Sequence, residues 1–99
     1  MSLFVVEHQH TAEQCPAHNS EMALMLLKHL SPENAAGYDV TIRGEAVIDN
    51  AHRLYLILDA PDREQVERFV QPFAQAGSIE IMAASSCESV VDRGTCEAL

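Results

Sequence analysis

The sequence predicts an α+β domain whose elements follow the order β-α-β-β-α-β. Four short apolar runs have the length of strands, at about residues 3–10, 38–48, 52–59 and 78–84. Two segments between them repeat apolar residues at helical spacing. A chain of 99 residues accommodates one domain with a single core. We expect that core over about residues 3–84, followed by a C-terminal tail over 85–99.

The first strand, from Leu3 to His10, carries apolar side chains on both of its faces. Asn19 or Ser20 can then cap a helix of about residues 21–30 by accepting a hydrogen bond from a free backbone N–H. Apolar residues form a wide stripe along this helix, so we expect much of it to be covered. Ser31-Pro32 ends the helix, because the residue before a proline disfavours helical backbone angles.

Residues 38–48 read as the second strand, and Asp49-Asn50 supplies a turn. Regular alternation along this strand predicts two faces: Val40, Ile42 and Ala46 on one, and Thr41, Arg43, Glu45 and Val47 on the other. The third strand, at about residues 52–59, again has no polar face. Its residues Leu54, Leu56 and Leu58 alternate with Tyr55 and Ile57.

Pro61 opens the second helix in its first turn, where no backbone N–H is needed. Its apolar stripe falls at i, i+3, i+4 and i+7, at Val66, Phe69, Val70 and Phe73. Pro72 should kink this helix or end its regular part, and Gly77 should be its C-terminal stop. The fourth strand follows at residues 78–84, and a short helix is expected near residues 88–93, before Gly94.

This element order matches the ferredoxin-like fold, a four-stranded antiparallel sheet with two helices on one face. The other face then has no cover within the chain, although the first and third strands carry apolar residues on both faces. We therefore expect a homodimer with sheets packed face to face. Over residues 3–84 the order of elements resembles that of dimeric α/β-barrel proteins.

The chain is acidic, with fifteen acidic and six basic residues and a formal net charge of −9. Affinity for nucleic acids or anionic membranes normally comes from clustered Lys and Arg, so neither partner is expected. No apolar stretch reaches the length of a membrane span, and no signal peptide is evident, so we expect a cytoplasmic protein. Three cysteines are an odd number, which leaves free thiols, metal ligands or one disulfide open.

Five side chains are candidate metal ligands. Side chains two apart in a strand leave the sheet on the same side, so His8 and His10 should lie together. Antiparallel pairing places the start of the third strand, with His52, beside the end of the first. Cys15 and His18, in the loop before the first helix, belong to the same end. Nitrogen and sulfur donors in this number suit zinc, nickel or copper.

Each candidate also has a purely structural interpretation. His8 and His10 could be polar residues at a strand end, solvated or bonded to the backbone. Cys15 could be a small buried hydrophobic residue, as lone cysteines often are. His18 could simply lie near a helix start, and His52 could belong to a turn.

The strand-borne His8-x-His10 and the following Cys15-Pro16 resemble features of small bacterial ferredoxin-like proteins, some of them nickel-binding or nickel-responsive. This resemblance implies histidine ligands for a metal. The leading hypothesis is a small dimeric protein that binds a transition metal through His8, His10 and their neighbours, for storage, sensing or trafficking. One alternative is a dimeric-barrel enzyme of the monooxygenase or isomerase type, with a histidine as general base toward a small molecule. Another is a non-catalytic subunit that docks on a partner. Neither the metal nor the role of Cys87 and Cys96 follows from the sequence.

Overall fold

The structure is a computed structural model that describes residues 1–97. Its centre is one antiparallel sheet of four strands: β1 (Ser2–His10), β2 (Thr41–Ile48), β3 (Arg53–Ala60) and β4 (Gly77–Ala84). The strands lie in the order β2-β3-β1-β4, so β1 pairs with both β3 and β4. The prediction of an α+β chain built on a four-stranded antiparallel sheet is confirmed.

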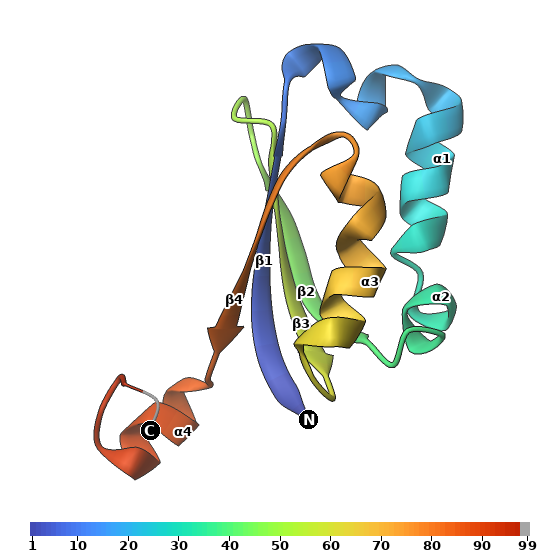
Figure 1. Cartoon of the computed structure of the whole chain (residues 1–99). Helices are drawn as coiled ribbons and strands as arrows, with labels where there is room; N and C mark the ends of the chain where they lie inside the picture. Colours follow the sequence, from blue (N-terminus) through green and yellow to red (C-terminus); the bar gives the residue numbers. More distant parts are fainter. Residues whose placement is uncertain (98–99) are drawn as a thin grey trace.

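Three helices lie on one side of the sheet, α1 (Ser20–His29), α2 (Pro32–Ala36) and α3 (Arg63–Ala74) (Figure 1). Asn19 caps α1, because its side-chain oxygen accepts hydrogen bonds from the backbone N–H groups of Glu21 and Met22, at 3.0 and 3.1 Å. The short helix α2 was not predicted. Ser31-Pro32 does end the first helix, but it also starts another, because Ser31 serves as an N-cap and Pro32 suits the first helical position.

The core fills the space between the sheet and α3. Its fully buried side chains include Val6, Leu56 and Leu58 from the sheet and Val66, Phe69 and Val70 from α3. Because α3 occupies the centre of this face, α1 lies beside it and packs against the core mainly through Leu26 and Leu30. The expectation that much of α1 is covered was therefore wrong for the single chain. Leu24, Met25 and Leu27 are 68, 69 and 66% exposed.

A β-bulge in β2 reverses the predicted faces of its second half. Ile42 lies opposite Leu58, but the next paired residue is Gly44, opposite Ile57. The extra residue shifts the alternation by one position. As a result Glu45 and Val47 lie opposite the inward-facing Leu56 and Leu54, on the helix side, and Ala46 lies on the open side. The predicted placement of these three residues was wrong.

Gly77 was predicted to end the second helix, but this prediction was wrong. Gly77 is the first residue of β4. Helix α3 ends at Ala74, two residues after Pro72. Gly77 pairs with His10, and a Cβ atom at position 77 would lie only 2.0 Å from the backbone oxygen of Gln9. A glycine is required here because two backbones approach closely, and this contact sets the spacing of β1 and β4 beside His10.

The far end of the chain lies away from the helical layer. Helix α4 (Cys87–Arg93), predicted at 88–93, follows β4 and ends at Gly94 with a left-handed φ of 79°. It lies near the N-terminus of the chain, at the opposite end of the sheet from the β1–α1 loop (Figure 1). Among residues 1–97 no helix has the length and apolar character needed to cross a bilayer.

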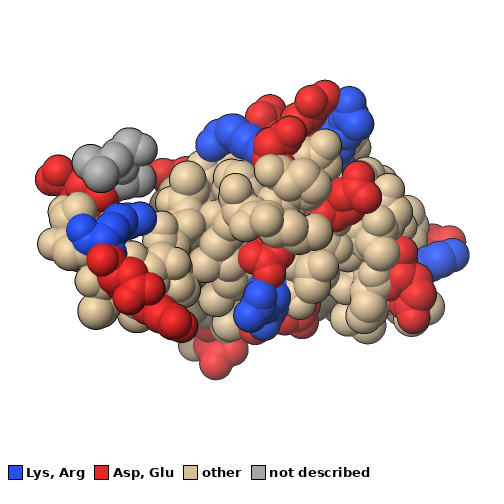
Figure 2. Space-filling model, turned by 90° about the horizontal axis from the view of Figure 1, so that it is seen from below, with Lys and Arg blue, Asp and Glu red and all other residues tan. Residues whose placement is uncertain are grey.

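Basic side chains are scattered over the surface. Figure 2 shows them mostly beside acidic ones, without a large basic cluster on the described part of this face.

Candidate functional site

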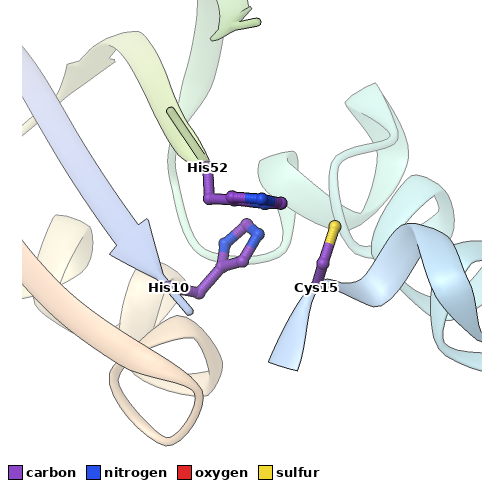
Figure 3. A group of neighbouring side chains, drawn as sticks. All are labelled: His10, Cys15 and His52. Atoms are coloured by element: carbon purple, nitrogen blue, oxygen red, sulfur yellow. The ribbon is translucent and has the colours of Figure 1, made fainter. Parts of the chain in front are cut away.

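Three side chains from different parts of the chain point toward one another at the end of β1 (Figure 3). A ring nitrogen of His10, a ring nitrogen of His52 and the sulfur of Cys15 all lie within 4.8 Å of one another. Each of the three residues is half-buried. Among residues 1–97 this is the one group of three or more His, Cys, Asp or Glu side chains with such spacing. We call it the His-Cys-His cluster.

The backbone brings these residues together in three ways. His10 is the last residue of β1, and its N–H donates a 3.1 Å hydrogen bond to the carbonyl of His52. His52 lies in the turn between β2 and β3 with φ of 52°, a left-handed conformation that is uncommon outside glycine. Cys15 separates two short 3-10 helices, Ala12–Gln14 and Pro16–His18, which fold the loop back over the end of β1.

A chain of hydrogen bonds fixes the protonation of the two strand histidines. Nδ1 of His8 lies 3.1 Å from the carbonyl oxygen of Ser78, which can only accept, so Nδ1 of His8 carries a proton. Nε2 of the neutral His8 ring is then an acceptor, and Nδ1 of His10, at 3.4 Å, donates to it. The other nitrogen of His10, Nε2, is left with a free lone pair. It is buried and has no hydrogen-bond partner among residues 1–97.

The surroundings of both rings favour their neutral form. Burial lowers the pKa of His8 below 6.5, and the neighbouring His10 lowers it further, although the bond to Ser78 opposes this shift. Burial also lowers the pKa of His10, with His52 as a second cause. Neutral imidazole is the form that binds metals, so the cluster favours the state needed for ligation.

The remaining predicted ligands have other surroundings. His8 leaves the same face as His10, as predicted, with ring centroids 5.3 Å apart. It is only 3% exposed and supports His10 from behind. His18 is exposed and is not one of the three clustered residues. Cys87 and Cys96 are exposed free thiols at the far end of the sheet.

The cluster forms part of the wall of a cavity of about 360 Å³ between α1 and the β2–β3 end of the sheet. Apolar side chains from both layers line it: Leu26, Leu27 and Leu30 from α1, Val47 from β2, Leu54 from β3 and Phe73 from α3. Glu45 and Asp49 also belong to the lining. This volume is within the range of small-molecule sites.

The geometry fits a tetrahedral metal ion after a small closure. Zinc lies about 2.0–2.1 Å from nitrogen and 2.3 Å from sulfur ligands, which places tetrahedral donors about 3.3–3.6 Å apart. The donors of the cluster are within 4.8 Å of one another. Their side chains would therefore need to close by no more than about 1.5 Å. Three protein donors leave one coordination position free.

Two features of this site were not predicted from the sequence. The carbonyl of Ser78 has no side-chain signal, although β4 pairing with β1 was implied by the expected topology. Regular alternation places Glu45 and Val47 on the wrong face, and Gly44 is the one local sign of the bulge that shifts them.

Comparison of the chain with known protein families, with curated proteins and with solved structures found no match.

Proposed function

We propose that the chain is a small protein that binds a transition metal ion through His10, Cys15 and His52. The observation that carries the proposal is the buried Nε2 of His10, which has no hydrogen-bond partner in the described part of the chain and is aimed at two further donor atoms. A buried polar atom without a partner is costly, and coordination of a metal ion removes that cost. Metal-bound histidines also donate their second N–H to a fixed acceptor, as Nδ1 of His10 does to His8.

The donor set narrows the choice of metal. Two imidazoles and one thiolate suit zinc, copper or nickel and do not suit magnesium or calcium, which prefer oxygen ligands. We infer storage, sensing or trafficking as the role, on a ferredoxin-like scaffold similar to nickel-binding proteins of that type. A reduced thiol at Cys15 fits a cytoplasmic setting.

The proposal is tested by cobalt binding, because Co²⁺ replaces zinc and reports thiolate ligation as a charge-transfer absorption band. The full chain should bind one Co²⁺ with this band, and zinc should displace it. The chain has three cysteines, which provide a matched comparison. Cys15→Ser should remove the band, whereas Cys87→Ser and Cys96→Ser should keep it. Absence of stoichiometric uptake of cobalt, zinc, nickel and copper would falsify the proposal.

A second candidate function is supported by the cavity next to the cluster. In an enzyme acting on a small molecule, Nε2 of His10 would be a general base, oriented by His8 as a histidine is oriented in other acid–base sites. Metal-free protein would then bind its substrate. If the chain takes up no metal but binds small apolar molecules in a manner that depends on His10, this second function is favoured.

We also infer a homodimer, formed through the sheet face that carries no helices (Figure 1). One row across all four strands of that face is apolar, with Gly44, Ile57, Val5 and Met82 side by side. Ile57 is 42% exposed although it lies at the middle of the sheet. Sedimentation or light scattering should give twice the chain mass, and Ile57→Lys should give the single-chain mass.

A further inference from the structure

The proposed metal would have one face turned toward the cavity. His10, Cys15 and His52 all belong to the cavity wall. A tetrahedral ion held by three protein donors on its wall side presents its fourth position to the cavity. Structural zinc sites close that position with a fourth side chain, whereas sites that act on other molecules keep it open. A ligand lying in the cavity could therefore complete the coordination.

The walls of the cavity determine the body of such a molecule. Besides the cluster, its polar lining residues are His8, Glu45, Asp49, Asn50 and Arg53. The rest of the lining is aliphatic or aromatic, with Leu26, Leu27 and Leu30 on one side, and Val47, Leu54 and Phe73 on the other. Val47 belongs to this wall only because the bulge between Ile42 and Gly44 turns it inward. A bound molecule is thus held by apolar contact beyond its donor atom.

The charged residues that line the cavity disfavour a ligand with an anionic body. Glu45 and Asp49 contribute carboxylates to the lining, and Arg53 is its single basic residue. The guanidinium of Arg53 already lies 3.8 Å from the carboxylate of Glu7. With a formal net charge of −9 on the chain, an anionic group on the body of the ligand would be repelled.

We propose that the cavity holds a small, mainly apolar molecule whose single nitrogen or sulfur donor completes the coordination of the metal. This inference rests on the proposed metal site. Its two requirements, a metal-binding head and an uncharged apolar body, can be tested separately because different residues supply them.

The test uses the full chain loaded with Co²⁺ and three probes that share one donor ring. These are imidazole, 4-phenylimidazole and 4-(4-carboxyphenyl)imidazole, titrated while the visible absorption of the bound cobalt is followed. Each affinity is expressed relative to the affinity of the same probe for aqueous Co²⁺. We expect 4-phenylimidazole to exceed imidazole by about tenfold or more, because its phenyl ring is buried in the cavity. The carboxylate should remove most of that gain.

Two leucines of α1 give matched variants. Leu27 lines the cavity and is 66% exposed, whereas Leu24 is 68% exposed and is not part of the lining. Neither side chain belongs to the buried core, so both variants should fold. Leu27→Asp should abolish the preference for 4-phenylimidazole, and Leu24→Asp should retain it.

Equal relative affinities for imidazole and 4-phenylimidazole, with cobalt bound, would overturn this inference and leave the metal site standing. An equal response of Leu27→Asp and Leu24→Asp would do the same. A chain that takes up no Co²⁺ at all would overturn both proposals.

Discussion

Two histidines of this chain, His29 and His10, are both half-buried among aromatic rings, and they differ in one respect. His29 stacks on Phe69 with ring centroids 4.8 Å apart. Its Nε2–H donates to the carbonyl of Phe69 at 2.6 Å, and its Nδ1 accepts from Asn34 at 3.2 Å. Both nitrogens are therefore satisfied. Nδ1 of His10 likewise has a hydrogen-bond partner, but its Nε2 has none within residues 1–97. Completeness of hydrogen bonding, rather than burial, separates a structural histidine from a candidate ligand.

The largest expected difference between the two histidines is in zinc affinity, which alanine substitution of each one tests. His10→Ala should weaken zinc binding by at least about 100-fold, the upper end of what loss of a supporting contact alone costs. His29→Ala should leave zinc affinity unchanged and lower the free energy of unfolding by about 2 kcal/mol, through the lost stacking and two lost hydrogen bonds. Competition with a chromophoric chelator measures the first effect and urea unfolding of metal-free protein the second. Similar losses of zinc affinity in both variants would remove the distinction.

Gly77 tests whether the backbone spacing beside His10 matters. Gly77→Ala places a methyl group against the backbone oxygen of Gln9, so β1 and β4 must separate at that point. We expect a loss of about 2 kcal/mol in the free energy of unfolding, together with weaker zinc binding.

The matched control for this change is Gly44→Ala. A Cβ atom at position 44 meets only a side-chain carbon of Ile57, at an ordinary 3.8 Å. This variant should be nearly as stable as the parent chain in the same urea titration. The spacing argument fails if the two alanine variants behave alike.

The hydrogen bond behind His10 should have a smaller effect. His8→Leu fills this buried position with an apolar side chain and removes the acceptor for the Nδ1 proton of His10. We expect zinc affinity to fall by about 10-fold, the lower end of the range for such supporting groups. His8→Gln retains an acceptor oxygen and should recover part of the affinity. If both variants bind zinc as tightly as the parent chain, His8 does not support the ligand.

The sequence predicted the sheet and the meeting of His10, Cys15 and His52 because those predictions depended on patterns that extend over several residues. Alternation fixed the strands, and antiparallel pairing placed His52 beside the end of β1. The errors occurred where a single residue decides the outcome.

One extra residue near Arg43 moves Glu45 to the other face of β2. At Gly77, the absence of a Cβ atom allows the close approach of β1 and β4. Whether an imidazole nitrogen has a partner is likewise a property of three-dimensional contacts. Spacing in the sequence could gather candidate ligands, but it could not separate His10 from His8 and His18.

The smallest expected effect is the pH dependence of the metal-free fold. The pKa values of His8 and His10 are lowered in the folded chain, chiefly by burial, so at pH below 6.5 the unfolded chain binds more protons than the folded one. The free energy of unfolding should therefore decrease as pH falls through 6.5, and this decrease should stop once pH is below the folded-state pKa values. Each group contributes at most about 1.4 kcal/mol per pH unit.

Urea titrations of chelator-treated protein at about five pH values, from about pH 7.5 to about pH 5, would measure this slope. His8→Gln removes one of the two titrating groups, so its slope should be smaller than that of the parent chain. An equal or steeper slope in His8→Gln would mean that other residues set the pH dependence. In that case the pH dependence of unfolding would give no evidence that His8 and His10 are held in the neutral form. The contrast between His10 and His29 would then depend on metal binding alone.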